Sequence, residues 1–136
     1  MNNIVTIVLS ALIGSGVTYW FGVRQLRTET EIRMKVEKYN NLIKYLRGFI
    51  GVSASSELKK SFLQEWETSW LYCSDDVFHA VQRMLDYARS LGKNGNGNSE
   101  VGKEILGKII IAMRKDLLNK KTELTSKDFI FLDVYE

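Results

Sequence analysis

The chain has 136 residues, 26% of them charged, and a formal net charge of +3 at pH 7. This small positive excess suits a surface near anionic lipid and is too weak to indicate binding to nucleic acid. A single cysteine, Cys73, excludes an internal disulfide, and a single histidine, His79, excludes the usual multi-histidine metal sites. We expect neither a metal nor a cofactor.

Residues 1–23 contain no charged side chain. Residues 4–23 are about the length that crosses a hydrocarbon core as a helix, and a lone segment in lipid can satisfy its backbone only as a helix. A signal peptide would begin with basic residues and end at a small-residue cleavage site. This stretch instead ends in the interfacial residues Tyr19, Trp20 and Phe21. We therefore expect an uncleaved transmembrane helix rather than a signal peptide or a soluble core helix.

Small or hydroxyl residues recur at every fourth position of this helix and form one stripe: Thr6, Ser10, Gly14, Thr18 and Gly22. Such residues allow helices to approach closely in lipid, so we expect the stripe to pack spans together or to line an opening.

Basic residues follow the span, beginning with Arg24 and Arg27, and none precedes it. The positive-inside bias then predicts that the N-terminus lies outside the cytoplasm and the C-terminal part inside it. Arg24 and Arg27 would form a cationic rim at the cytoplasmic mouth.

The chain has no proline, and no glycine lies between Gly22 and Gly48, so we expect one continuous helix over about residues 3–49. Its soluble part carries apolar residues at a 4-3-4-3-4 spacing, which we name the self-association seam: Ile32, Val36, Tyr39, Ile43, Leu46 and Ile50. Two interpretations stay open. The seam packs on the protein's own bundle, or it joins copies in a coiled coil.

Three further helices are expected after a loop at residues 51–56. The first is capped by Ser55 or Ser56, and its apolar face contains Leu58, Phe62, Trp66 and Trp70. The second is capped by Ser74, carries Asp75 and Asp76 in its first turn and can end at Gly92. Its apolar stripe is Val77, Val81, Met84, Leu85 and Ala88.

Residues 93–98 read as a flexible surface loop. The last helix follows, with Arg114 and Lys115 near its end and an apolar stripe of Val101, Ile105, Ile109, Ala112, Met113 and Leu117. Thr125 or Ser126 would cap a short final turn through Leu132. The fold class is all-α: a transmembrane helix over residues 1–23 continues into a small cytoplasmic helical bundle over residues 24–136.

The sequence contains no P-loop, paired cysteines, HExxH or GxSxG. His79 and Arg83 lie four residues apart and share a helical face. They form either an acid–base or anion-binding pair, or an ordinary helix surface. We favour the ordinary surface. Cys73 should be a partly buried, unreactive thiol. Adjacent Asp75 and Asp76 point in different directions, so they should complement the helix dipole rather than act as a carboxylate pair. We expect no enzymatic activity.

The single span and the tracts at residues 70–81 (WLYCSDDVFHAV) and 112–129 (AMRKDLLNKKTELTSKDF) resemble a group of small membrane-anchored helical proteins of prokaryotes. The architecture is similar to the accessory membrane proteins of RNA-targeting type VI-B CRISPR systems, which strengthen antiviral defence. That family has been linked to HEPN ribonucleases, whose signature is an arginine followed by a histidine after four to six residues. Here that arginine is absent, because Tyr72, Cys73 and Ser74 occupy the required positions before His79. The resemblance therefore implies a HEPN-like fold without its catalytic motif.

Together these features predict a self-associating effector of CRISPR-linked antiviral defence in the bacterial inner membrane, which forms a ring or pore and perturbs the membrane. The alternative is a membrane-tethered adaptor whose bundle recruits a soluble partner. Expected partners are lipid, further copies of the chain, and a CRISPR effector or other defence protein. The small-residue stripe favours the first function, since a mere anchor does not need it.

Overall fold

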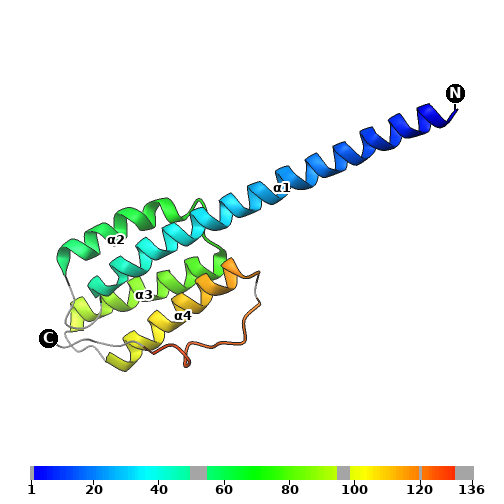
Figure 1. The fold of residues 1–136 in the computed structure, drawn as a ribbon. Helices are drawn as coiled ribbons and strands as arrows, with labels where there is room; N and C mark the ends of the chain where they lie inside the picture. The colour runs from blue at the N-terminus through cyan, green and yellow to red at the C-terminus, as the bar shows by residue number, and fades with distance from the viewer. Residues whose placement is uncertain (1, 50–54, 95–98, 120, 131–136) are drawn as a thin grey trace. The chain divides into compact units, whose positions relative to one another are not determined.

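The computed structural model describes residues 2–49, 55–94, 99–119 and 121–130 (Figure 1). Within these residues the fold is all-helical and has no strand, which confirms the predicted class. The elements are α1 (Asn2–Leu46), the 3-10 turn η1 (Arg47–Phe49), α2 (Ser56–Ser69), α3 (Asp75–Asn94) and α4 (Ser99–Leu117). The chain divides into two units, Met1–Met34 and Lys35–Glu136.

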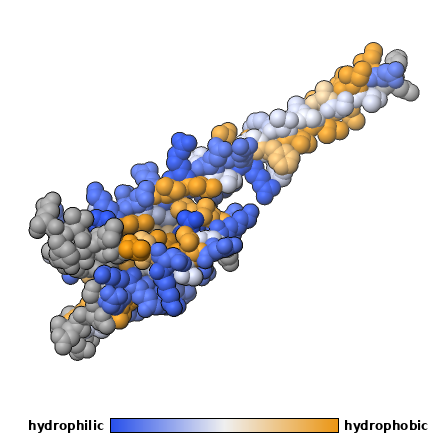
Figure 2. Space-filling view, turned by 60° about the horizontal axis from the view of Figure 1, so that its bottom comes forward, coloured by the Kyte–Doolittle hydropathy of each residue, from blue (hydrophilic) through white to orange (hydrophobic). Residues whose placement is uncertain are grey.

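The first unit is the N-terminal part of α1, which continues without a break through its three glycines. Every side chain from residue 3 to residue 34 is exposed. Its hydrophobic residues gather on the surface toward the N-terminus, whereas hydrophilic residues predominate on the visible face of the second unit (Figure 2). The helix is long and apolar enough to cross a membrane, and none of its apolar window is buried.

The first unit continues beyond residue 23, where the expected span ends, to Met34. Residues 24–34 group with the first unit, and their side chains are all exposed. Among the described residues, the first buried side chain is that of Tyr39. The helix therefore extends for about three turns beyond the predicted span before it joins a core.

The core of the second unit forms where the last turns of α1 pack with α2, α3 and α4 (Figure 1). The apolar stripes predicted for α3 and α4 supply half of its buried hydrophobic side chains. Its most deeply buried side chains are Tyr39, Leu42, Leu46, Phe62, Val77, Val81 and Ile109. The first position of the α4 stripe, Val101, is exposed instead, and the first buried hydrophobic side chain of α4 is that of Leu106.

Two details of α2 and α3 were predicted wrongly. Trp70 does not belong to the buried face of α2, because the helix ends at Ser69 and Trp70 is its C-cap, 64% exposed. Its ring packs at the surface against Phe78, with centroids 4.6 Å apart. Gly92 does not end α3, which continues to Asn94. A glycine weakens a helix by about 1 kcal/mol without breaking it. Positions 93 and 94 of the predicted loop are therefore helical, and residues 95–98 are outside the described residues.

Local signals fix the helix ends. The Ser74 hydroxyl accepts a hydrogen bond from the Val77 amide at 3.4 Å, as expected of an N-cap. Ser55 occupies the N-cap position of α2 with extended backbone, but its side chain makes no cap hydrogen bond. Beyond α4, Asn119 has a φ of 51°. Asparagine tolerates this left-handed conformation better than most residues, which suits the end of a helix.

Two glycines permit close backbone approaches. A Cβ on Gly48 would lie 2.5 Å from Cβ of Leu58, so glycine lets η1 contact α2. A Cβ on Gly107 would lie 2.7 Å from the carbonyl oxygen of Ser126, so glycine lets the last segment run back along α4. In the turn at residues 126–128, the Asp128 carboxylate accepts hydrogen bonds from the Thr125 amide at 2.7 Å and the Thr125 hydroxyl at 2.8 Å. This turn ends at residue 128, and residues 129 and 130 do not continue it toward Leu132, which lies outside the described residues.

Candidate functional site

An apolar groove of about 280 Å³ lies between α1 and α4 in the second unit. Val36 and Ile43 of α1 line one side, and Ile110 and Leu117 of α4 line the other. Leu118, at the end of α4, is 43% exposed beside it. This arrangement provides apolar surface that a helix from another molecule can cover.

The self-association seam is divided by the structure. Tyr39 and Leu46 are buried in the protein's own core, and Val36 and Ile43 line the groove. Ile32 is exposed in the first unit, and Ile50 lies outside the described residues. The seam therefore contributes both to the bundle and to a surface that stays open.

A polar cluster beside the groove joins α1 to α4. The Asp116 carboxylate accepts a hydrogen bond from the Tyr39 hydroxyl and lies 3.2 Å from Nζ of Lys35. The Asp116 and Lys35 side chains are only 12% and 17% exposed. Burial, together with the hydrogen bond to Asp116, raises the pKa of Tyr39 above its ordinary value, so this hydroxyl remains a donor at neutral pH. The cluster fixes how α1 packs on α4 and so shapes the groove.

A second polar contact joins α1 to α2. Nζ of Lys38 lies 3.1 Å from Oε1 of Glu65. The two groups form an ion pair but not a hydrogen bond, because Oε1 of Glu65 has no hydrogen-bond partner among the described residues. The buried hydroxyl of Tyr72 has none there either. Burial, together with the nearby Glu65 charge, raises the pKa of Tyr72. We interpret this contact as structural.

The small-residue stripe of the first unit is open along its length. A Cβ on Gly14 or Gly22 would meet nothing within 4 Å. The Ser10 hydroxyl donates to the carbonyl of Ile7 at 2.9 Å, and the Thr18 hydroxyl donates to the carbonyl of Gly14 at 2.8 Å. These protons are therefore bonded within the helix, as the interior of a bilayer requires. Thr6, the remaining hydroxyl residue of the stripe, is exposed too.

The two arginines of the expected rim are exposed. The Arg24 guanidinium lies over the Trp20 ring, 5.4 Å from its centroid, in a cation–π contact. The Trp20 ring meets the Phe21 ring edge to face at 5.3 Å. An aromatic pair followed by arginine suits the boundary between hydrocarbon and headgroups.

Cys73 and His79 were considered for chemistry in the sequence, and the structure shows the surroundings of each. Burial raises the pKa of the Cys73 thiol, which keeps it protonated and poorly nucleophilic. His79 is exposed, and its ring lies beside that of Phe78 on the same helix, with centroids 5.5 Å apart. Among the described residues, no three His, Cys, Asp or Glu side chains gather where they could hold a metal ion.

Leu42 and Asp116 are among the structural residues that the sequence analysis missed, as are the buried Ala80 and Leu106. Leu42 follows Tyr39 by three positions and precedes Leu46 by four, so helical spacing could have identified it. The pairing of Asp116 with Lys35, 81 positions apart, leaves no local signal.

Comparison with protein-family models, curated proteins and solved structures finds no match to this chain. The similarity to CRISPR accessory membrane proteins stays a prediction from sequence.

Proposed function

We propose that this chain is a single-span membrane protein whose helical bundle binds further copies of itself. The observation that carries the proposal is the uncovered apolar helix. Its large side chains are exposed throughout, for example Ile4 at 68% and Leu12 at 64%. Exposure of apolar surface to water costs about 25 cal/mol per Å², and a bilayer removes this cost. The core helix of a soluble protein is mostly buried, whereas this apolar window is bare.

Self-association has support from each unit considered separately. In the first, the open Gly14 and Gly22 positions allow the backbone of another helix to approach. In the second, the groove between α1 and α4 leaves Val36 40% exposed and Leu118 43% exposed. A helix of a second copy would cover these side chains and gain apolar contact.

The biological role that we propose is a non-enzymatic effector of antiviral defence, whose assembled spans perturb the bacterial inner membrane as a ring or pore. The stripe would pack the spans or line the opening, and Arg24 and Arg27 would form the cytoplasmic rim. This role rests on the resemblance of the sequence to the accessory membrane proteins.

A membrane-tethered adaptor is the second candidate. It is favoured by the hydroxyls of Ser10 and Thr18, whose protons are already bonded within the helix and not offered to a neighbouring span. In this function the groove between α1 and α4 would receive a soluble partner, and the span would only anchor the bundle.

We expect the C-terminus to lie in the cytoplasm, because basic residues follow the span. A reporter that is active only in the cytoplasm, fused after Glu136, should be active in intact cells. A reporter that functions only in the periplasm should be silent at the same junction. Activity of the periplasmic reporter instead would contradict the orientation and place the bundle outside.

Replacement of Val36 by Glu should weaken self-association through the groove, because it places a charge on the apolar surface that a second copy would bury. We expect the mass of the detergent-solubilised particle to fall toward that of the monomer, measured by light scattering after size exclusion.

Val101→Glu is the matched control. Val101 is 38% exposed on α4, close to the 40% of Val36, but it does not line this groove. The control should retain the wild-type mass. Equal masses for wild type and both variants would mean that the groove does not join copies, which would favour the adaptor.

A further inference from the structure

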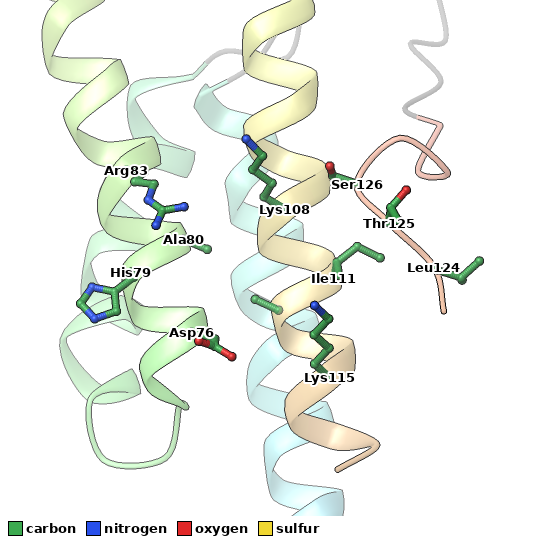
Figure 3. Close-up of a pocket in the computed structure, with 11 residues that line it drawn as sticks. Asp76, His79, Ala80, Arg83, Lys108, Ile111, Lys115, Leu124, Thr125 and Ser126 are labelled. Carbon is green, nitrogen blue, oxygen red and sulfur yellow. The ribbon is translucent and has the colours of Figure 1, made fainter. Parts of the chain in front are cut away.

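A second hollow, of about 420 Å³, lies on the face of α4 in the second unit (Figure 3). We name it the basic trough. Ile111 and Ala112 of α4 form its floor, α3 forms one wall, and Leu124 to Ser126 form the other. The trough exists because small residues, Ala80 and Ala112, lie where α3 meets α4, and because the close approach at Gly107 holds the last segment beside α4.

Cationic side chains dominate the trough. Arg83 comes from α3, and Lys108 and Lys115 come from α4, against the single carboxylate of Asp76. No described residue forms an ion pair with Arg83 or Lys115. Lys108 lies 3.0 Å from Glu104, but both side chains are about half exposed, and such surface pairs are weak. The trough therefore holds positive charge that the chain itself leaves available.

The chemistry of these groups selects an anion with several oxygens. A guanidinium presents a planar fork that matches phosphate in two hydrogen bonds, and ammonium groups add point charges. The Ser126 hydroxyl lies on the far wall. The apolar floor and the volume exceed the needs of a bare phosphate, and about 300–1,000 Å³ is the usual size of small-molecule sites.

We propose that the basic trough binds a small phosphate-bearing molecule with an organic portion, its phosphate held by Arg83 of α3 and Lys108 of α4, which lie level with each other (Figure 3). The organic portion would lie over Ile111 and Leu124. His79 precedes Arg83 by four residues and lies at the edge of the same trough. From the sequence alone, the two residues were interpreted as ordinary helix surface. This site is independent of the span and of self-association. The phosphate can come from a soluble nucleotide or from a lipid headgroup, and the experiment separates the two sources.

The test uses the full chain in dodecyl maltoside and ATP without magnesium as the soluble probe, followed by calorimetry. We expect saturable binding that weakens as salt rises from about 0.05 to 0.15 M. Arg83→Gln and Lys108→Gln should each raise Kd about tenfold or more, which is the scale of one charge-assisted hydrogen bond. Both side chains reach solvent, so the variants should fold, and their thermal midpoints verify this.

Arg89→Gln is the matched control, because it makes the same change on α3 at a side chain that does not line the trough and is 71% exposed. It should leave Kd unchanged. An equal loss in Arg89→Gln would reduce the result to general charge attraction and overturn the site.

A second arm titrates the same detergent-solubilised protein with a short-chain phosphatidylglycerol, and with phosphatidylcholine of the same chain length as the uncharged comparison. Saturable binding of phosphatidylglycerol without binding of ATP, lost in Arg83→Gln, would assign the phosphate to a lipid headgroup. Absence of saturable binding for ATP and for phosphatidylglycerol would overturn the proposal, whatever the oligomeric state of the protein.

Discussion

Asp116→Ala should lower the free energy of unfolding by about 3 kcal/mol, which is the scale for removing one partner of a buried ion pair. The Asp116 carboxylate is only 12% exposed and satisfies both the Tyr39 hydroxyl and the Lys35 ammonium. Its loss removes the acceptor of the buried Tyr39 hydroxyl and the carboxylate that pairs with the nearly buried Lys35 ammonium. Denaturant unfolding in mild detergent, followed by the fluorescence of buried Trp66, measures the change.

Asp86→Ala is the control for this prediction. Asp86 also pairs with a cation, Arg89, at 3.3 Å, but the two side chains are 61% and 71% exposed. Such a pair contributes about 0–1 kcal/mol, so the control should unfold nearly as the wild type does. A similar loss in both variants would mean that the polar cluster does not hold α1 against α4.

Gly14→Leu should lower the mass of the detergent-solubilised particle or abolish membrane permeabilisation. Lipid tails are as apolar as leucine, so association of spans must come from close packing rather than from the hydrophobic effect. A leucine in the middle of the stripe would separate the helix backbones. Permeabilisation is measured by dye release from liposomes that contain the protein.

Gly16→Leu makes the same substitution two residues along, on nearly the opposite face of the helix. A Cβ added at either glycine would meet nothing within 4 Å, so neither variant should disturb the monomer. Ile13→Leu is a milder, volume-conserving control. If the groove between α1 and α4 dominates assembly, the Gly14→Leu particle should keep its mass and lose only permeabilisation. Full mass and full activity in both glycine variants would make the span an anchor and favour the adaptor.

Local features of the chain were readable from the sequence because they depend on neighbours within a few positions. The uncharged run that ends before Arg24, the N-cap Ser74 and the apolar spacing of α3 each act within one helix. Hydrogen bonds and side-chain periodicity of a helix repeat over about four residues. These features therefore predicted the all-α class and the continuous first helix.

Tertiary structure alone decided which apolar and charged residues meet. The seam predicted as one face is split, because Tyr39 is buried by partners far along the chain while Val36 stays open. Trp70 is exposed because α2 ends one residue before it. The basic trough needs Arg83 of α3 beside Lys108 of α4, 25 positions apart, and the pairing of Lys35 with Asp116 spans 81 positions. Such contacts depend on how separate helices pack, which no local spacing encodes.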